Sequence, residues 1–590
     1  MLPLLLVGIL SSASPLISVG PNVHVSAANP LRFHGEVQAA ADPGDPKHLI
    51  VCTWLGGEPN GMTTDPHLVT YTSFDGGSTW LPKILGTAFT DPTCALGNNG
   101  LAVVAGIGWN NGQFAQVYRS IDGGRTWSEP QLLAGSDRPF LNIDNVSQKL
   151  QGRVYLQVMP QFYPVKATYK NAVAVYHSSD GGAAFSPYVL TPTFPEPPNL
   201  GGVNTTVLTD GTLLSDVQIL PKLLDGNYTS SVWVMRSTDG GLTFSDSVMV
   251  TNMVVPPRGF AGVESFPFLA ADTSHGPFND RAYVAWSDIR FGHADVFIIH
   301  SDDEGKTWSQ PVVVDDIPTP GKGPDASNCN IAVNKNGVVG VAWHDSRGIG
   351  SAPEGGWIRF AASFDGGESF THSVVVSSAP SRLYPKNVLM LTGRALGGGP
   401  LLNIFGPDLH FGIEDQDMFG LAAAADGTFH PVWEDNRTGV AQLWSASIKV
   451  QGEATKNGDP ALRNFRDVTS DVALHAKSVV FNRHTRTITL DATFDNTSKN
   501  AIKGPIKFRL TILRSILGTP NLTNSDSGNG WRGAIVTFPV DGGILQPGKQ
   551  TRMRRLVFHF DDFREAKPDI TQDIQQFIQI GGHAYAAIGE

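Results

Sequence analysis

Six charged side chains stand just before strand-like runs that lie far apart in the chain. They are Glu36, Asp91, Arg138, Glu264, Asp325 and Asp417. If these positions converge, the carboxyl groups raise one another's pKa, as acid and base catalysis requires, and the arginine orients an anionic or hydroxyl-rich ligand. Two other roles suit the same carboxylates: they could hold calcium, or they could cap exposed strand amides. The fold that positions them decides between these roles.

A long segment later in the chain adds one more candidate. Residues 381–412, "SRLYPKNVLMLTGRALGGGPLLNIFGPDLHFG", are too many for a plain turn between two strands. Long loops on rigid scaffolds often shape a binding site. This segment carries Arg382 and Tyr384. Tyr384 is the tyrosine best placed for a nucleophile, although aromatic residues are also common on ordinary loops.

Three arginines recur in a shared motif, in the stretches "WSDIR", "WHDSR" and "WEDNR". The motif occupies 286–290, 343–347 and 433–437. Because it stands at the same place in each repeat, we interpret it as a local Asp–Arg pair beside a packed Trp. The arginines could instead bind a carboxylate together, but the equivalence of the three copies favours the structural role.

A second motif shows which elements carry these side chains. "SFDGGSTW" at 73–80 returns as "SIDGGRTW" at 120–127 and "SDDEGKTW" at 301–308, with looser copies from residues 178, 237 and 363. Asp accepts hydrogen bonds from the turn amides, Gly supplies positive φ, and the aromatic residue packs between sheets. Six copies cannot all line one site, so we interpret this box as scaffold.

Each box follows a run with strand character, such as "HLVTYTS" or "DVFIIHS", and two more such runs lie upstream. One further run follows the box, which gives four antiparallel strands per repeat and indicates a β-propeller. A seventh unit at 419–447 lacks the box, and its outer strand could come from 22–27, "NVHVSA". We therefore predict an all-β fold with a seven-bladed propeller over residues 21–452, with six blades as the alternative.

The pattern changes after residue 452. Runs such as "RTITLDATF" and "RRLVFHF" alternate without any box. They predict a C-terminal β-sandwich, immunoglobulin-like or fibronectin-like, over residues 462–590. Such modules commonly act as spacers or adhesion units.

Composition narrows the class further. The chain has 590 residues, a net charge of −11 and no basic cluster, which argues against a nucleic-acid partner. Residues 1–20, "MLPLLLVGILSSASPLISVG", hold one short apolar run that resembles a secretory signal, and no later segment looks transmembrane. We expect a secreted or cell-surface monomer. Cys52 and Cys94 could pair or could remain buried thiols.

The boxes on propeller blades resemble those of the sialidase-like superfamily, also called bacterial-neuraminidase-repeat proteins, over about three quarters of the chain. The resemblance implies an exo-acting glycosidase with an arginine cluster, a Tyr/Glu nucleophile pair and an Asp acid/base. Arg32 in "LRFHGE" and Arg138 in "SDRPF" are the candidates for that cluster, although the Ile-Pro that follows the family's first arginine is missing. Asn204 stands where the family has Asn-Glu, without the glutamate.

Two main functions follow. The first is an exported sialidase-like glycoside hydrolase that acts on glycans at the mouth of the propeller channel, with no required cofactor. The second is a non-catalytic propeller that binds a glycan or a protein. A third, a structural protein with calcium in the channel, shares the acidic residues but needs no arginine.

Overall fold

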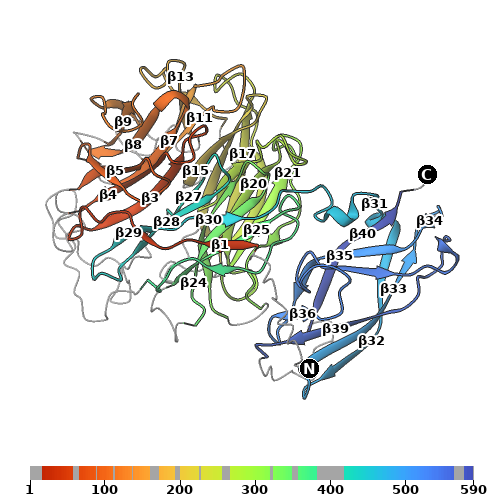
Figure 1. Ribbon diagram of the computed structural model, residues 1–590. Helices are drawn as coiled ribbons and strands as arrows, with labels where there is room; N and C mark the ends of the chain where they lie inside the picture. The colour runs from red at the N-terminus through yellow and green to blue at the C-terminus, as the bar shows by residue number, and fades with distance from the viewer. Residues whose placement is uncertain are drawn as a thin grey trace, which may run out of the picture.

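The computed structural model describes residues 16–56, 66–87, 90–109, 113–135, 137–159, 172–192, 194, 200–224, 227–255, 266–318, 323–348, 356–381, 418–563 and 577–588. Nearly all regular structure in them is β-strand, apart from 3-10 turns at Asn98–Gly100, Pro460–Leu462, Thr469–Asp471 and Asp541–Gly543. A larger body is followed in the chain by a smaller one, seen in blue in Figure 1.

Six four-stranded antiparallel sheets succeed one another along the chain. Blade 1 has β3 (His34–Ala41), β4 (Leu49–Leu55), β5 (His67–Ser73) and β6 (Leu81–Ile84). Blade 2 has β7 (Thr90–Leu96), β8 (Ala102–Trp109), β9 (Gln113–Ser120) and β10 (Gln131–Ala134). Blade 3 has β11 (Asp137–Ile143), β12 (Val154–Met159), β13 (Ala174–Ser178) and β14 (Val189–Leu190).

The next three sheets repeat this order. Blade 4 has β15 (Leu200–Val207), β16 (Leu213–Leu224), β17 (Asn227–Ser237) and β18 (Val248–Val255). Blade 5 has β19 (Phe268–Ala271), β20 (Ala282–Asp288), β21 (Asp295–Ser301) and β22 (Val312–Val313). Blade 6 has β23 (Ala326–Val333), β24 (Val339–Asp345), β25 (Trp357–Ser363) and β26 (Val374–Val375).

The seventh sheet confirms the prediction of seven blades closed by the N-terminal strand. It contains β27 (Gly420–Ala423), β28 (Phe429–Asp435) and β29 (Gln442–Ser445), and β29 pairs with β2 (Val23–His24). A side ribbon of β1 (Ile17–Val19) and β30 (Ile448–Val450) joins the same sheet. Strand pairing thus begins at Ile17, inside the range 1–20 assigned to the export segment, of which residues 1–15 lie outside the described residues.

The innermost strands surround a central channel. Each of β3, β7, β11, β15, β19 and β23 contacts the next, and β27 contacts β3, so the ring is closed. Apolar side chains between successive blades form the core, including the completely buried Trp286 and Trp343. Closure matters because an open blade would present unpaired amides at its edge.

In the first copy of the box, the side-chain hydrogen bonds predicted for its turn are present. Ser73 Oγ donates to Asp75 Oδ1 (2.8 Å), and the Thr79 amide and hydroxyl donate to the two Asp75 oxygens (2.9 and 2.6 Å). Trp80 Nε1 donates to the Gly77 carbonyl (3.1 Å), which fixes the indole over the turn. In the second copy the same bonds from Thr126 lower the pKa of Asp122 to about 2. The box therefore stabilises the outer hairpin of a blade that carries it.

The C-terminal body packs two four-stranded sheets around one apolar core. One sheet has β31 (Phe465–Asp467), β40 (Gln579–Ala587), β35 (Ile506–Arg514) and β37 (Ile535–Phe538). The other has β32 (Val472–Asn482), β33 (Thr487–Asn496), β39 (Arg554–Phe560) and β36 (Pro520–Leu522). A short pair, β34 (Ile502–Lys503) and β38 (Ile544–Leu545), lies beside them. This arrangement is the predicted sandwich; its assignment to the immunoglobulin or fibronectin type stays a prediction.

Buried polar contacts attach the sandwich to blades 5 and 6. Arg532 Nη1 donates to the Val313 carbonyl (2.6 Å), and the His372 and Trp531 rings stack with centroids 4.3 Å apart. Arg509 Nη2 donates to Asp365 of the sixth box and to Ser369 Oγ. Arg509 and Arg532 are both buried, so each makes its contact with the propeller away from solvent.

Candidate functional site

The inner strands share an irregularity near their first residues. The register shifts between Gly35 and Val37 in blade 1, and at the corresponding place in blades 2, 3, 4 and 6. At four of these bulges a residue other than glycine has positive φ: Glu36 (49°), Asp91 (52°), Arg138 (46°) and Asn328 (45°). Such backbone conformations cost about 1–3 kcal/mol each and cluster at functional sites. Three of the four are residues that the sequence analysis singled out.

Hydrogen bonds connect three of these bulges in a chain. The Asp91 amide donates to Glu36 Oε2 (2.5 Å), and the Arg138 amide donates to Asp91 Oδ2 (3.2 Å). Each carboxylate therefore caps the bulged amide of the next blade, which is one of the roles weighed from the sequence. The same contacts bring Glu36, Asp91 and Arg138 together at one end of the channel. We call this end the mouth.

Arg138 has an aromatic partner from another blade. Its guanidinium carbon lies 3.3 Å from the centroid of the Phe266 ring, two residues before β19. A guanidinium stacked on a ring keeps its N–H donors in the plane, the geometry in which a guanidinium binds carboxylate oxygens. The contact joins blades 3 and 5, so it lies at the mouth and is not a local hairpin pair.

The remaining predicted residues divide into two groups. Asp325 Oδ1 accepts the Ala294 amide (2.8 Å) and the Asp325 amide donates to Ser346 Oγ (2.7 Å), so this carboxylate connects blades 5 and 6. Arg32 donates from Nε to the Gly56 carbonyl (2.6 Å). Three candidates, Glu264, Tyr384 and Asp417, lie outside the described residues.

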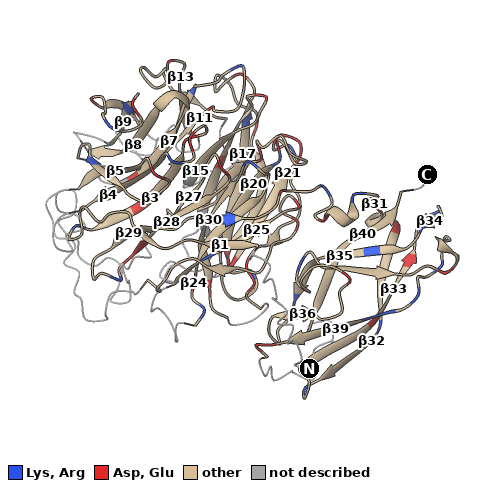
Figure 2. Cartoon of the chain, in the orientation of Figure 1, with Lys and Arg blue, Asp and Glu red and all other residues tan. Residues whose placement is uncertain are grey.

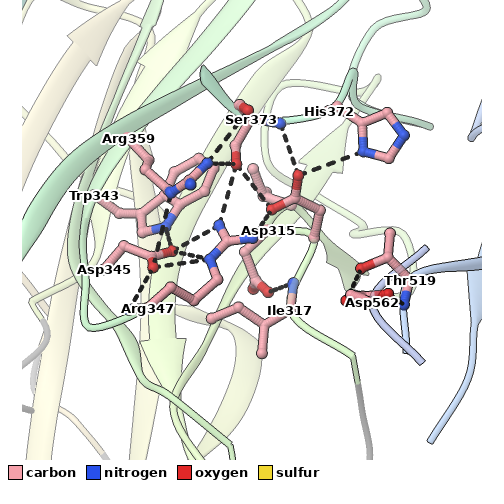
Figure 3. A network of polar contacts seen from close by, with 12 residues as sticks. Asp315, Ile317, Trp343, Asp345, Arg347, Arg359, His372, Ser373, Thr519 and Asp562 are labelled. Atoms are coloured by element: carbon pink, nitrogen blue, oxygen red, sulfur yellow. Dashed lines mark hydrogen bonds and ion pairs between the residues drawn. The ribbon is translucent and has the colours of Figure 1, made fainter. Parts of the chain in front are cut away.

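The interpretation of the recurring Trp-Asp-Arg motif is confirmed. Trp343 Nε1 donates to Asp345 Oδ2 (3.0 Å), and Arg347 Nη2 donates to the same oxygen (2.8 Å). Blades 5 and 7 repeat the pairs Arg290–Asp288 and Arg437–Asp435. In Figure 3, Arg347 and Arg359 lie around Asp345 with Ser373 beside them. These guanidiniums are therefore bound locally.

One copy of this motif contains a residue whose role the sequence analysis missed. Glu434 follows Trp433 where the other copies have Ser287 and His344, and it is 1% exposed. Burial raises its pKa well above the usual range, and repulsion from Glu36 adds to the shift, while the Glu36 backbone opposes it. The surroundings of Glu434 therefore favour the protonated form of its carboxyl, close to an acidic residue of the mouth. The sequence signal for this residue was the carboxyl side chain at a position where the other two copies have Ser and His.

The channel beneath the mouth contains a cavity of about 290 Å³. Its lining includes Gln38, Thr93, Asn204 and Asn330, several alanines, and no Asp, Glu, Lys, Arg or His among the described residues. Behind Asn204, on the paired strand, Asp216 is fully buried and burial raises its pKa well above the usual range. The acidic character expected of the channel is therefore confined to its mouth.

Charged side chains elsewhere are spread over loops and strand ends, with both signs interspersed (Figure 2). Within the described ranges, no group of three or more His, Cys, Asp and Glu side chains is arranged to hold a metal ion. No helix in that part of the chain is long and apolar enough to cross a membrane.

Cys52, Cys94 and Cys329 are buried free thiols, so Cys52 and Cys94 do not pair.

Comparisons with known proteins find similarity at the level of solved structures only. No family model and no curated protein matches the chain. An α-L-arabinanase of Penicillium chrysogenum, complexed with arabinobiose, is similar to 55% of this chain over 94% of its own length, with 15% identity and a TM-score of 0.38. A Trypanosoma rangeli sialidase in complex with 2,3-difluorosialic acid is similar over 94% of this chain and 88% of its own, with 10% identity and a TM-score of 0.37.

A third similar structure is a lectin. The Aleuria aurantia lectin, in complex with Fucα1-6GlcNAc, is similar over 58% of this chain and 96% of its own, with 13% identity and a TM-score of 0.34. At such low similarity the role of each residue here has to be argued from its own surroundings.

Proposed function

We propose that the protein is a carbohydrate-active propeller that binds a glycan at its channel mouth and hydrolyses a glycosidic bond there. One observation carries the proposal. Glu36, Asp91 and Arg138 come from three successive blades, have strained backbones and are bonded to one another. Strain of this kind persists only where the surrounding structure maintains it, commonly at a ligand site.

Each group at the mouth has a chemical role in this proposal. Arg138, stacked on Phe266, donates in-plane hydrogen bonds to a carboxylate or hydroxyl group of the glycan. Glu36 and Glu434 provide two carboxyl groups in unlike environments, of which Glu434 keeps its proton. A glycosidase needs such a difference, because a protonated carboxyl donates to the leaving oxygen while an ionised one assists attack.

A second candidate function is glycan binding without hydrolysis. Glu36 and Asp91 each already accept a backbone amide, and Glu434 is almost inaccessible to solvent. These contacts suit a lectin-like propeller in which the carboxylates shape the mouth and Arg138 makes the main polar contact. Export of the chain and a monomeric state remain part of the proposal, and calcium held by the mouth carboxylates remains the alternative to both functions.

The test assays the parent protein and three variants, Glu36→Gln, Glu434→Gln and Arg138→Ala, on a panel of glycosides and on a glycan array. A hydrolase should lose roughly 100-fold or more in turnover when a general acid or base is removed, at unchanged melting temperature. Glycan binding that depends on Arg138, without turnover by the parent protein, would establish the lectin-like function. If neither activity appears and a chelator lowers the melting temperature, the acidic residues hold calcium instead.

A further inference from the structure

The channel cavity has a lining that differs in chemistry from the mouth above it. Six inner-strand residues from six blades lie at one level, because each pairs with the same position of the second strand, three residues after the partner of the box serine. In the five blades that have a bulge, this level lies just beyond it. We call these six residues the channel ring. They are Gln38, Thr93, Phe140, Asn204, Phe268 and Asn330, and all six line the cavity.

Two members of the ring have unused hydrogen-bonding capacity. Gln38 Nε2 and Asn204 Oδ1 are buried, and neither has a hydrogen-bond partner within the described part of the chain. Gln38 is 7% exposed and Asn204 is 4% exposed. One of these atoms is a donor and the other an acceptor, and hydroxyl groups of one ligand can pair with either, since a hydroxyl both donates and accepts. Asn330, in contrast, already donates to the Phe419 carbonyl.

The rest of the ring suits the carbon skeleton of a polyol. Phe140 and Phe268 add apolar surface to the lining, while they also pack against the hydrophobic clusters between blades. Apolar walls with a few polar groups are the usual composition of a small-molecule site, and about 290 Å³ lies at the small end of the range for such sites. The space is therefore suited to one sugar unit and not to a longer chain.

The channel ring also disfavours charged groups on a ligand. Its described lining contains no cationic side chain, so a buried carboxylate would lose its hydration without gaining a counter-ion. A hydroxyl group loses less on entering, because the carboxamides replace its hydrogen bonds with water. An acidic sugar would therefore keep its carboxylate at Arg138, above the ring.

We propose that the channel ring is a subsite for one uncharged, hydroxyl-rich unit, a neutral sugar or polyol, directly beneath the mouth. The subsite deepens the proposed carbohydrate function and rests on it. Its chemical class differs from the acidic sugar that the sialidase-like resemblance implies, since recognition in the ring depends on carboxamides and aromatic rings.

The test measures binding of neutral probes (xylitol, arabinose and galactose) and acidic ones (N-acetylneuraminic and glucuronic acids) by calorimetry. Gln38→Met and Asn204→Leu remove the polar atoms at similar volume, and Ala95→Leu narrows the cavity without touching a polar group. The control is Gln131→Met, the same change on the outer strand β10, where Gln131 donates to the Gly182 carbonyl. Each ring variant should weaken neutral-probe binding about tenfold, with the control and the melting temperature unchanged.

The outcomes separate the ring from the mouth. Loss of neutral-probe binding in the ring variants but not in Arg138→Ala supports the subsite, and the turnover and glycan-array assays of the mouth variants then decide the proposed function separately. Loss in Arg138→Ala alone overturns the subsite and leaves the mouth intact. Binding of acidic probes that equals that of neutral ones and falls in Asn204→Leu also overturns it. If Asn204→Leu does not fold, Gln38→Met and Ala95→Leu decide the matter alone.

Discussion

Arg509 of the sandwich and Asp365 of the sixth propeller blade form an ion pair in which both side chains are almost completely buried, at 4% and 3% exposure. The equivalent aspartates of the other five boxes are exposed or half-buried. Burial raises the pKa of Asp365, but the charge of Arg509 and the hydrogen bonds from Ser363 and Ser369 together outweigh it, so the pKa is lowered. The same turn motif is therefore surface scaffold in five blades and an interdomain contact in the sixth.

Breaking this pair should cost far more than breaking a surface box. We expect Asp365→Ala and Arg509→Met each to lower the free energy of unfolding by about 3–5 kcal/mol, because either change leaves an uncompensated buried charge or donor. Asp239→Ala, the matched change in the fourth box, should cost about 1 kcal/mol, the usual loss for a few turn hydrogen bonds. Chemical denaturation measures both, and equal costs would contradict the interdomain role of Asp365.

Box variants should affect folding and not ligand binding. Asp239 accepts bonds from Ser237 and Thr243 within its own turn, on the outer hairpin of blade 4. We expect Asp239→Ala to reduce thermal stability while glycan binding or turnover of the folded protein stays unchanged. Unchanged stability combined with abolished binding would overturn the interpretation of the box as scaffold.

The contact between the domains should weaken in mildly alkaline solution. His583 lies 3.3 Å from Asp467 and 3.4 Å from Glu368 of blade 6, and these carboxylates raise its pKa to about 9. Since this pKa is above the usual 6.5, the stabilisation is complete below about pH 6.5 and is lost as the pH rises towards 9.

The corresponding measurement is a series of melting temperatures between pH 6 and pH 9.5. We expect the parent protein to lose on the order of 2 kcal/mol over this interval through His583, and His583→Asn to lack that loss. Identical pH profiles for the two proteins would show that His583 carries no stabilising proton.

Asp216 should give the folding stability a pH dependence opposite in sign to that of a carboxylate whose pKa is lowered in the folded protein. Burial raises its pKa well above the unfolded value, so the stability that it contributes is present at low pH and is lost as the pH rises. Asp216→Asn removes this dependence at nearly constant volume. We expect the variant to gain stability relative to the parent between pH 4 and pH 8, and a difference that stays constant or reverses would contradict the protonated state.

The stacking of Arg138 on Phe266 predicts a specific response to conservative changes. Arg138→Lys keeps the charge but loses the planar donors, and Phe266→Leu keeps an apolar side chain but loses the ring face. We expect each to weaken glycan binding by about 1–2 kcal/mol, or roughly 5- to 30-fold, with little change in folding. Binding that is unchanged in Arg138→Lys would mean that charge alone matters at this position.

The propeller and its closure could be predicted because they depend on local patterns. The boxes need Asp, Gly and an aromatic residue at fixed spacing, and the run "NVHVSA" could complete the boxless seventh unit. For the mouth, the repeat spacing identified Glu36, Asp91 and Arg138 as the starts of inner strands. The hydrogen bonds between them could not be predicted, because they involve amides exposed at bulges. Where a bulge forms depends on the partner strand and on the next blade.

Sequence by itself predicted seven blades and the closure of the ring by the N-terminal strand. It also predicted the scaffold role of the box and the local Asp–Arg pairs. Each of these features depends on residues that are close in the chain or repeated along it. Tertiary structure alone decided that the pKa of Glu434 is raised, that the described lining of the channel cavity is uncharged below an acidic mouth, and that Asp365 joins the two domains. Burial and the proximity of charges from distant blades determine these properties, and neither can be read from residue type or spacing.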